Sequence, residues 1–227
     1  MRRENRNRAR NPFEVKDCVL IAIGTGINAQ NLRELRDRLT TVHAGCIYYH
    51  FWGGLLIPRF EEPEYNNDFA AWARHGLHDY ILAERLAVID PRDFPDLEEL
   101  RKHLIEVIEE RLYETDMVPW AKRDQQFHFK RSQTVVFDTN KRMADPSKLP
   151  EVLPTLSVGS IFYHFIDARR RSSQGLDDFS SWLGGYGTKY TRLVQEIADI
   201  DPYFTTLHEI RERMCQLTRH YCTSEEK

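Results

Sequence analysis

The chain has 227 residues, of which 41% are hydrophobic and 11% aromatic, and its formal net charge is −3. Such a composition belongs to a globular protein that buries a core, and it excludes a disordered chain. The small negative charge gives no general attraction to nucleic acid or membranes. No apolar run is long enough to span a membrane, and the four cysteines form no CxxC pair, so we expect a cytoplasmic protein with free thiols.

The first ten residues contain five arginines and a single glutamate. We expect residues 1–11 to form a basic flexible tail. Such an arm can contact phosphates, so a nucleic-acid or ribosome-associated factor is one possible function. We do not favour it, because the rest of the chain has no basic stripe with interleaved aromatic residues.

The segment that follows the tail has a helical pattern. Asn11 and Pro12 suit a helix start, and apolar residues from Val15 to Ile23 recur at helical spacing. Residues 15–23 are also compatible with a buried strand. Further helical patterns cover residues 28–42, a segment that opens at Asn67-Asp68, a segment that ends at Asp90-Pro91, and residues 97–113.

One motif occurs twice. The stretch Gly45 to Phe51 returns 114 residues later as Gly159 to Phe165, each time with Tyr-His-Phe at its end, and Asp-Phe-x-x-Trp follows both. Residues 46–52 could be a strand or a helix, and the run of arginines after the second occurrence favours a helix.

The repeated motif predicts a tandem duplication. We expect a mainly α protein with little or no β structure, built from two tandem copies of a multi-helix unit packed with pseudo-twofold symmetry. Helical repeat 1 would cover residues 12–114, a linker 115–125, and helical repeat 2 residues 126–224. The two repeats would form one compact unit.

The two motifs, the later Ile-Asp-Pro and the closing amphipathic helix resemble a bacterial family of domains of unknown function (number 5752). The resemblance extends over residues 12–114, and the second copy is diverged. It implies no activity.

The repeated Tyr-His pairs and the Asp before each Phe-x-x-Trp are the candidate site. As core residues they would pack the helices, and the Asp would cap a helix. As a functional site, His50 with Asp68 could transfer protons, which makes these two the candidate catalytic residues. The candidate binding residues are Arg33, Tyr49, His50, Asp68, Trp72, Tyr163, His164, Asp178 and Trp182.

We expect no metal and no cofactor, because His75 and His78 lack the rest of a metal motif. The favoured function is a binding or accessory protein with a groove near the Tyr-His motifs for a small anionic ligand or a protein partner. The alternative is an enzyme that uses His50 and Asp68 as acid and base. We lean against an enzyme, since no Ser or Cys nucleophile accompanies both motifs.

Overall fold

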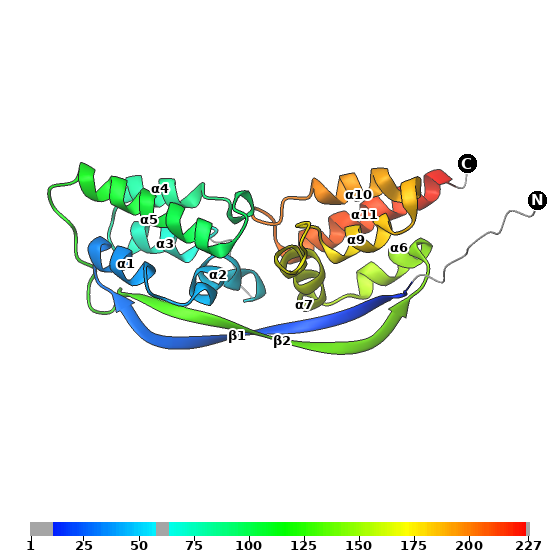
Figure 1. Ribbon diagram of the computed structural model, residues 1–227, viewed down its shortest axis with the longest axis horizontal. Helices are drawn as coiled ribbons and strands as arrows, with labels where there is room; N and C mark the ends of the chain where they lie inside the picture. Colours follow the sequence, from blue (N-terminus) through cyan, green and yellow to red (C-terminus); the bar gives the residue numbers. More distant parts are fainter. Residues whose placement is uncertain (1–10, 58–63, 226–227) are drawn as a thin grey trace, which may run out of the picture. The chain divides into compact units, whose positions relative to one another are not determined.

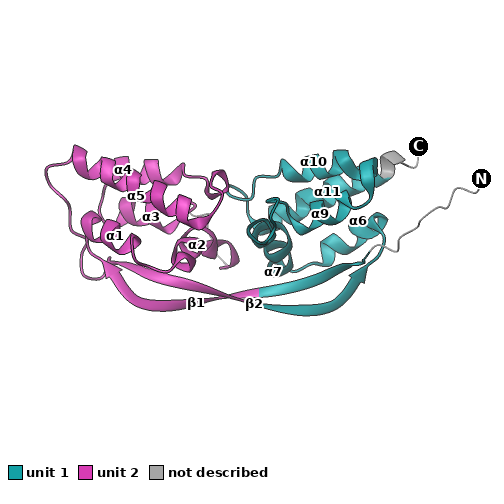
Figure 2. Ribbon diagram, in the orientation of Figure 1, with its two compact units in different colours: residues 1–18, 136–227 teal, residues 19–135 magenta. Residues whose placement is uncertain are grey.

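The computed structural model describes residues 11–57 and 64–225. The chain forms two compact units, coloured separately in Figure 2. Unit 1 comprises Met1–Cys18 and Val136–Lys227, and unit 2 comprises Val19–Val135. The basic tail expected at residues 1–11 lies outside the described residues except for its last position.

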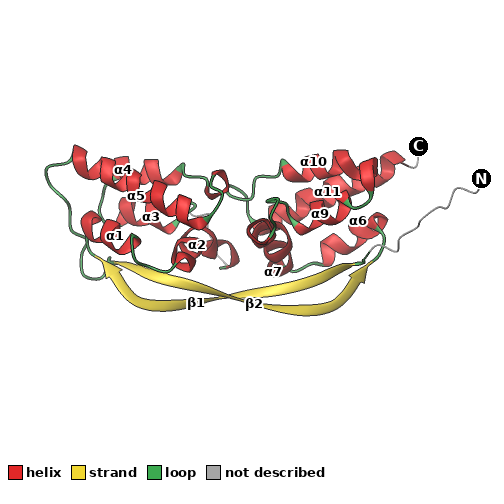
Figure 3. Cartoon of the chain, viewed as in Figure 1, coloured by secondary structure: helices red, strands yellow, loops and turns green. Residues whose placement is uncertain are grey.

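Two long strands join the helices, as Figure 3 shows. Strands β1 (Phe13–Ala29) and β2 (Phe127–Met143) have 17 residues each and form a two-stranded sheet. The expected mainly α fold with little or no β structure is therefore wrong, as is the helix favoured over residues 15–23. The physical reason is that β-branched side chains alternate along this stretch and two glycines follow, which favours a strand over a helix.

The expected packing of two tandem helical copies with pseudo-twofold symmetry is also wrong. Each strand contributes residues to both units, because the first residues of β1 belong to unit 1 and the rest of β1 belongs to unit 2. The compact units therefore do not follow the ranges 12–114 and 126–224. Pairing between strands so distant in sequence leaves no local periodic signal.

We call the sheet of β1 and β2 the ribbon. Unit 2 packs its helices on one side of its part of this ribbon (Figure 1). Its core combines aliphatic and aromatic side chains of the helices with phenylalanines of the strands, and Leu35, Ile47 and Phe129 are almost fully buried. Its helices are α1 (Leu32–Leu39), α2 (Ala44–Trp52), η1 (Gly53–Leu56), α3 (Asp68–His75), α4 (Tyr80–Ala87), η2 (Pro91–Asp93) and α5 (Leu97–Glu114).

Unit 1 has a similar order of elements but begins with short helical turns, because three prolines interrupt its first segment. In α7, a Cβ on Gly159 would overlap the carbonyl of Cys18, so glycine lets this helix approach the strand backbone. The elements are η3 (Pro146–Lys148), α6 (Leu149–Val152), η4 (Leu153–Thr155), α7 (Val158–Ile161), the π-helix η5 (Phe162–Asp167), α8 (Ala168–Arg171), α9 (Asp178–Gly184), η6 (Gly187–Tyr190), α10 (Thr191–Ala198) and α11 (Leu207–Glu225). Across residues 11–57 and 64–225, none of the helices has both the length and the apolar character that crossing a membrane requires.

A local kink occurs once in each strand, directly after a threonine. In β1, Thr25 Oγ1 donates to Phe129 O across the ribbon and accepts from the N–H of Ile27, while Gly26 takes a φ of 75°. In β2, the residue after Thr139 is likewise left-handed, since Asn140 has a φ of 58°. Gly and Asn are the residues that tolerate this conformation best, so each strand has the residue type that its kink needs.

Replacing Gly26 by alanine should destabilise the protein by about 1 kcal/mol, because a Cβ is strained at positive φ. Gly24→Ala is the matched control: Gly24 lies in the same strand, and a Cβ there would meet nothing within 4 Å. Chemical denaturation of both variants gives the comparison. Equal losses of unfolding free energy would contradict the assigned role of Gly26.

Candidate functional site

Two neighbouring helices bring His50 and Asp68 together in unit 2. His50 lies in the last turn of α2. The N-cap of α3 is Asn67, whose side chain accepts from the N–H of Ala70. The carboxylate of the next residue, Asp68, is therefore free to reach His50, and its Oδ2 lies 2.8 Å from His50 Nδ1.

The other ring nitrogen of His50 is bonded to the ribbon. The backbone N–H of Lys130 in β2 donates to His50 Nε2 at 3.1 Å. Because Nε2 accepts, the proton of the neutral ring is on Nδ1, which donates it to Asp68. The His50 side chain is 3% exposed, so the ring is held inside the protein by one bond on each nitrogen.

This hydrogen bond satisfies a backbone N–H on the outer edge of the ribbon, the edge of β2 that faces away from β1. Phe129 O accepts from Thr25 and thus faces β1. In a trans peptide the following N–H points the opposite way, so the N–H of Lys130 faces away from β1. His50 supplies the acceptor that this edge N–H would otherwise lack, which fixes the helices to the strand.

A phenylalanine of β2 fits beside the same ring. Phe127 lies 4.6 Å from the His50 ring centroid and stacks on Phe69 at 5.1 Å with an interplanar angle of 17°. Trp72 packs edge-on against Phe127, and its Nε1 donates to Gln125 O. The aromatic side chains of α2 and α3 thus enclose the first residue of the strand.

Unit 1 has the same set of contacts. His164 Nδ1 lies 2.7 Å from Asp178 Oδ2, and His164 Nε2 accepts from the N–H of Lys16 in β1 at 2.9 Å. Phe13 stacks on Phe179 at 4.9 Å with an interplanar angle of 15°. Here too the N-cap is the preceding residue, Asp177, which leaves Asp178 for the histidine.

An arginine extends this second site. Arg171 donates to Asp178 Oδ2 at 3.1 Å, to Asp167 Oδ2 at 3.0 Å and to Tyr163 O at 2.9 Å. Its guanidinium lies 4.0 Å from the centroid of the Tyr163 ring. The π-helical turn of η5 carries both Tyr163 and the buried Asp167.

The environment shifts several pKa values. Burial lowers the pKa of His50 and outweighs the opposing effect of Asp68. Burial raises the pKa of Asp178, but the hydrogen bond from His164 and the charge of Arg171 prevail and hold it below its ordinary value. Burial, with nearby Asp167 and Asp17, raises the pKa of Cys18 to about 12, so this thiol is not a nucleophile near neutral pH.

The structure brings most of the sequence-predicted residues into these two sites. Tyr49 and Tyr163 are buried and pack edge-on against the adjacent histidine. Trp182 holds the chain ahead of β1, since its Nε1 donates to Asn11 O at 3.3 Å. Arg33 is different: it is exposed on α1 and takes no part in the hydrogen bonds of His50.

The geometry favours a structural role for His50 and His164, attaching helices to a strand, over a role in proton transfer. A general acid or base needs a ring nitrogen within hydrogen-bond reach of a substrate. Both nitrogens of His50 and of His164 are bonded to protein groups instead. In the described ranges, no group of three or more His, Cys, Asp or Glu side chains is arranged to hold a metal ion.

A surface groove of about 620 Å³ lies in unit 2, away from the Tyr-His motif. Its residues include large apolar side chains in a segment that sequence reasoning treated as a linker. A Met, a Val, a Pro and a Trp within four residues are unusual for a polar linker, and this is the signal that could have revealed the groove. The lining residues are Leu77, His78, Asp79, Tyr80, Ile81, Arg111, Thr115, Met117, Val118, Pro119 and Trp120.

His50→Ala should destabilise the protein by about 2–4 kcal/mol, because it leaves a cavity and an edge N–H without its acceptor. His103→Ala, on the exposed side of α5, is the control and should cost much less. Chemical denaturation gives both values. An equally mild effect of the two substitutions would contradict the structural role of His50.

Stability should also fall at acid pH. The folded-state pKa of His50 lies below its ordinary value of 6.5, so the unfolded chain takes up its proton first and is favoured as the pH falls below that value. Protonated Nε2 could no longer accept from Lys130. We expect the unfolding free energy of the wild type to approach that of His50→Gln between about pH 7 and about pH 5. A constant difference across this range would contradict the prediction.

Comparison with known proteins gives a family and a fold. A family model described as "Family of unknown function (DUF5752)" matches residues 10–219. The solved structure titled "The structure of OrfY from Thermoproteus tenax" is similar, with a TM-score of 0.80 and 25% sequence identity over 94% of this chain and 96% of that chain. No curated protein matches. Because the family model covers most of its length, the chain belongs to this family of unknown function.

Proposed function

We propose that the protein is a non-catalytic binding or accessory protein whose groove in unit 2 receives an apolar segment of a protein partner. The observation that carries the proposal is the exposure of four large side chains around one groove. Tyr80 is 55% exposed, Ile81 53%, Met117 83% and Trp120 66%. Trp and Tyr are the residues that most often dominate binding energy at interfaces, and Met adapts to irregular partners.

Hydrogen bonds and an ion pair fix the residues around the groove before any partner binds, which supports a role in recognition. The N–H of Ala121 donates to Gln30 O at 2.7 Å, and Trp120 forms an antiparallel bridge with Asn31. Asp79, which also lines the groove, caps α4 through the N–H of Leu82 and accepts from Arg111 Nε at 2.8 Å. A prearranged site loses less conformational entropy on binding.

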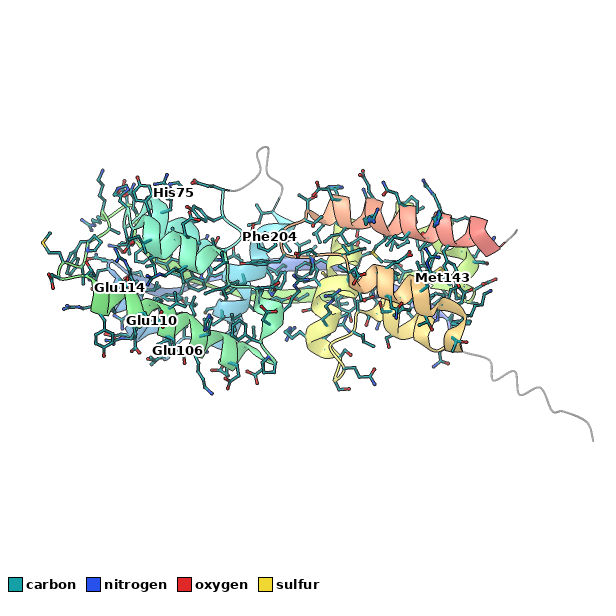
Figure 4. The ribbon with its side chains drawn as sticks, turned by 90° about the horizontal axis from the view of Figure 1, so that it is seen from above. His75, Glu106, Glu110, Glu114, Met143 and Phe204 are labelled. Carbon is teal, nitrogen blue, oxygen red and sulfur yellow. The ribbon has the colours of Figure 1, made fainter. Side chains whose placement is uncertain are left out.

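A protein segment fits this groove better than a small ligand does. Small-ligand sites enclose most of the ligand surface, whereas here the apolar side chains stand out into solvent. The charges at the groove also form pairs: Arg111 bonds to Asp79 and to Glu114, which Figure 4 labels along α5 with Glu106 and Glu110. Little net charge is left to attract a small anion.

The two histidine sites support the non-catalytic part of the proposal. Each histidine binds a carboxylate on one side and a strand N–H on the other, which accounts for both ring nitrogens without a substrate. The enzyme alternative, with His50 and Asp68 as acid and base, would require breaking the bond to Lys130.

Trp120→Ala should weaken peptide binding about 30-fold, the effect of removing an interface residue worth about 2 kcal/mol. Peptides are first selected from a random display library on the full-length chain, and their dissociation constants are then measured by calorimetry. Phe204→Ala is the matched control, since Phe204 is a large aromatic residue of unit 1 that is 60% exposed (Figure 4).

The proposal is supported if the selected peptides bind the Trp120→Ala variant more weakly than the wild type and bind the Phe204→Ala variant with unchanged affinity. A selection that yields no binder dependent on Trp120 contradicts it. Titration with short RNA and DNA at low and high salt tests the nucleic-acid alternative, because phosphate contacts weaken steeply as salt rises. Salt-dependent nucleic-acid binding by the wild type would replace the proposed function.

A further inference from the structure

The outer edge of β1 is closed at both ends and open in between. In unit 1, the N–H of Lys16 on this edge donates to His164 Nε2. At the far end, in unit 2, the chain around Trp120 and Ala121 pairs with Gln30 and Asn31. Between them, from Val19 to Asn28, β1 pairs with β2 alone within residues 11–57 and 64–225.

The open part of this edge lacks the usual protection. Exposed edge strands carry charged residues or proline, which prevent pairing with other chains. No residue from Cys18 to Gln30 is charged or a proline. The apolar segment Val19–Ile23 includes Val19, 50% exposed, and Ile21, 48% exposed. Strand β2, by contrast, carries five charged residues, namely Lys130, Arg131, Asp138, Lys141 and Arg142.

We propose that two copies of this chain associate through antiparallel pairing of Val19–Ile23 of one chain with the same segment of the other. The two ribbons would then form one four-stranded sheet. Backbone N–H and C=O groups of an edge strand are complementary to those of an identical antiparallel strand.

The residues of the segment fit pairing with themselves. With Ile21 opposite the Ile21 of the second copy, Val19 faces Ile23 and Leu20 faces Ala22 in both directions. All five are apolar, and pairs of β-branched residues across strands stabilise a sheet. None of the five residues is charged, so no like charges meet within the paired segment.

The same reasoning disfavours β2 as the self-pairing edge. Four of its five charged residues are positive, and pairing centred on Val136 would place Lys130 opposite Arg142 and Arg131 opposite Lys141. Val136 of β2 is nevertheless as exposed as the residues of the apolar segment, at 42%. It therefore provides a matched position for a control substitution.

The test is the mass of the full-length chain, measured by light scattering during size-exclusion chromatography over a range of concentrations. We expect the wild type to have twice the mass of one chain. Ile21→Lys places two lysines directly opposite each other and should raise the dimer dissociation constant at least about tenfold. Val136→Lys should leave it unchanged. Circular dichroism melting of each variant checks that it is folded.

A cysteine scan gives a second, independent measurement of the register. Ile21→Cys in a Cys222→Ser background should form an intermolecular disulfide on mild oxidation, because opposite residues of paired strands lie close enough for one. Val88→Cys, at a side chain 75% exposed, is the control for random collisions. Crosslinking at Ile21 well above the control supports the proposal.

Three results would overturn it. They are a wild type that stays monomeric at all concentrations, a dimer that Ile21→Lys leaves intact, or a dimer that Val136→Lys weakens as much as Ile21→Lys does. A complex of one chain with a different protein through the β1 edge, with no self-association, would also overturn it.

Discussion

The structure depends on a requirement of the backbone: the N–H groups on the outer edge of a two-stranded ribbon need acceptors. One such group in each unit, at Lys130 and at Lys16, receives its acceptor from a buried histidine. The carboxylate on the other ring nitrogen holds the histidine in the tautomer that can accept. The phenylalanine at the end of each strand then fills the aromatic space beside the ring. In each unit, packing of the helices and attachment of the strand therefore rely on the same side chains.

Local patterns in the sequence predict most of the helices from Leu32 onward but not the two strands that join them. The helices from Leu32 onward have strong apolar periodicity, which is a local property. The pairing of β1 with β2 connects positions more than a hundred residues apart and leaves no such signal. Asp68 was expected to cap its helix. Because Asn67 does so, the side chain of Asp68 is available to His50, and a single sequence gives no means to distinguish two adjacent capping residues.

The same difference in sequence signal separates the buried residues of the protein from those of the exposed groove. Tyr49 and His50 attracted attention because a titratable residue recurs among aromatic ones, yet they are buried and their hydrogen bonds are internal. Trp120 was overlooked because it occurs once, in a segment without periodicity. A motif that recurs among buried residues stands out in a sequence more readily than a cluster of exposed apolar side chains.

The order of the strands along the chain has a consequence for synthesis. Unit 2 is continuous in sequence, so it can fold once residue 135 has left the ribosome. Unit 1 is discontinuous, and the acceptor for Lys16 is 148 residues away at His164. During translation the part of β1 that belongs to unit 1 is made long before the helices of unit 1, so the apolar side chains of Phe13, Val15 and Cys18 stay exposed until those helices have been made. A ribosome-bound chain long enough for residue 135 to have left the exit tunnel, but too short to expose the helices of unit 1, should therefore show a protease-resistant unit 2 while Phe13 stays accessible.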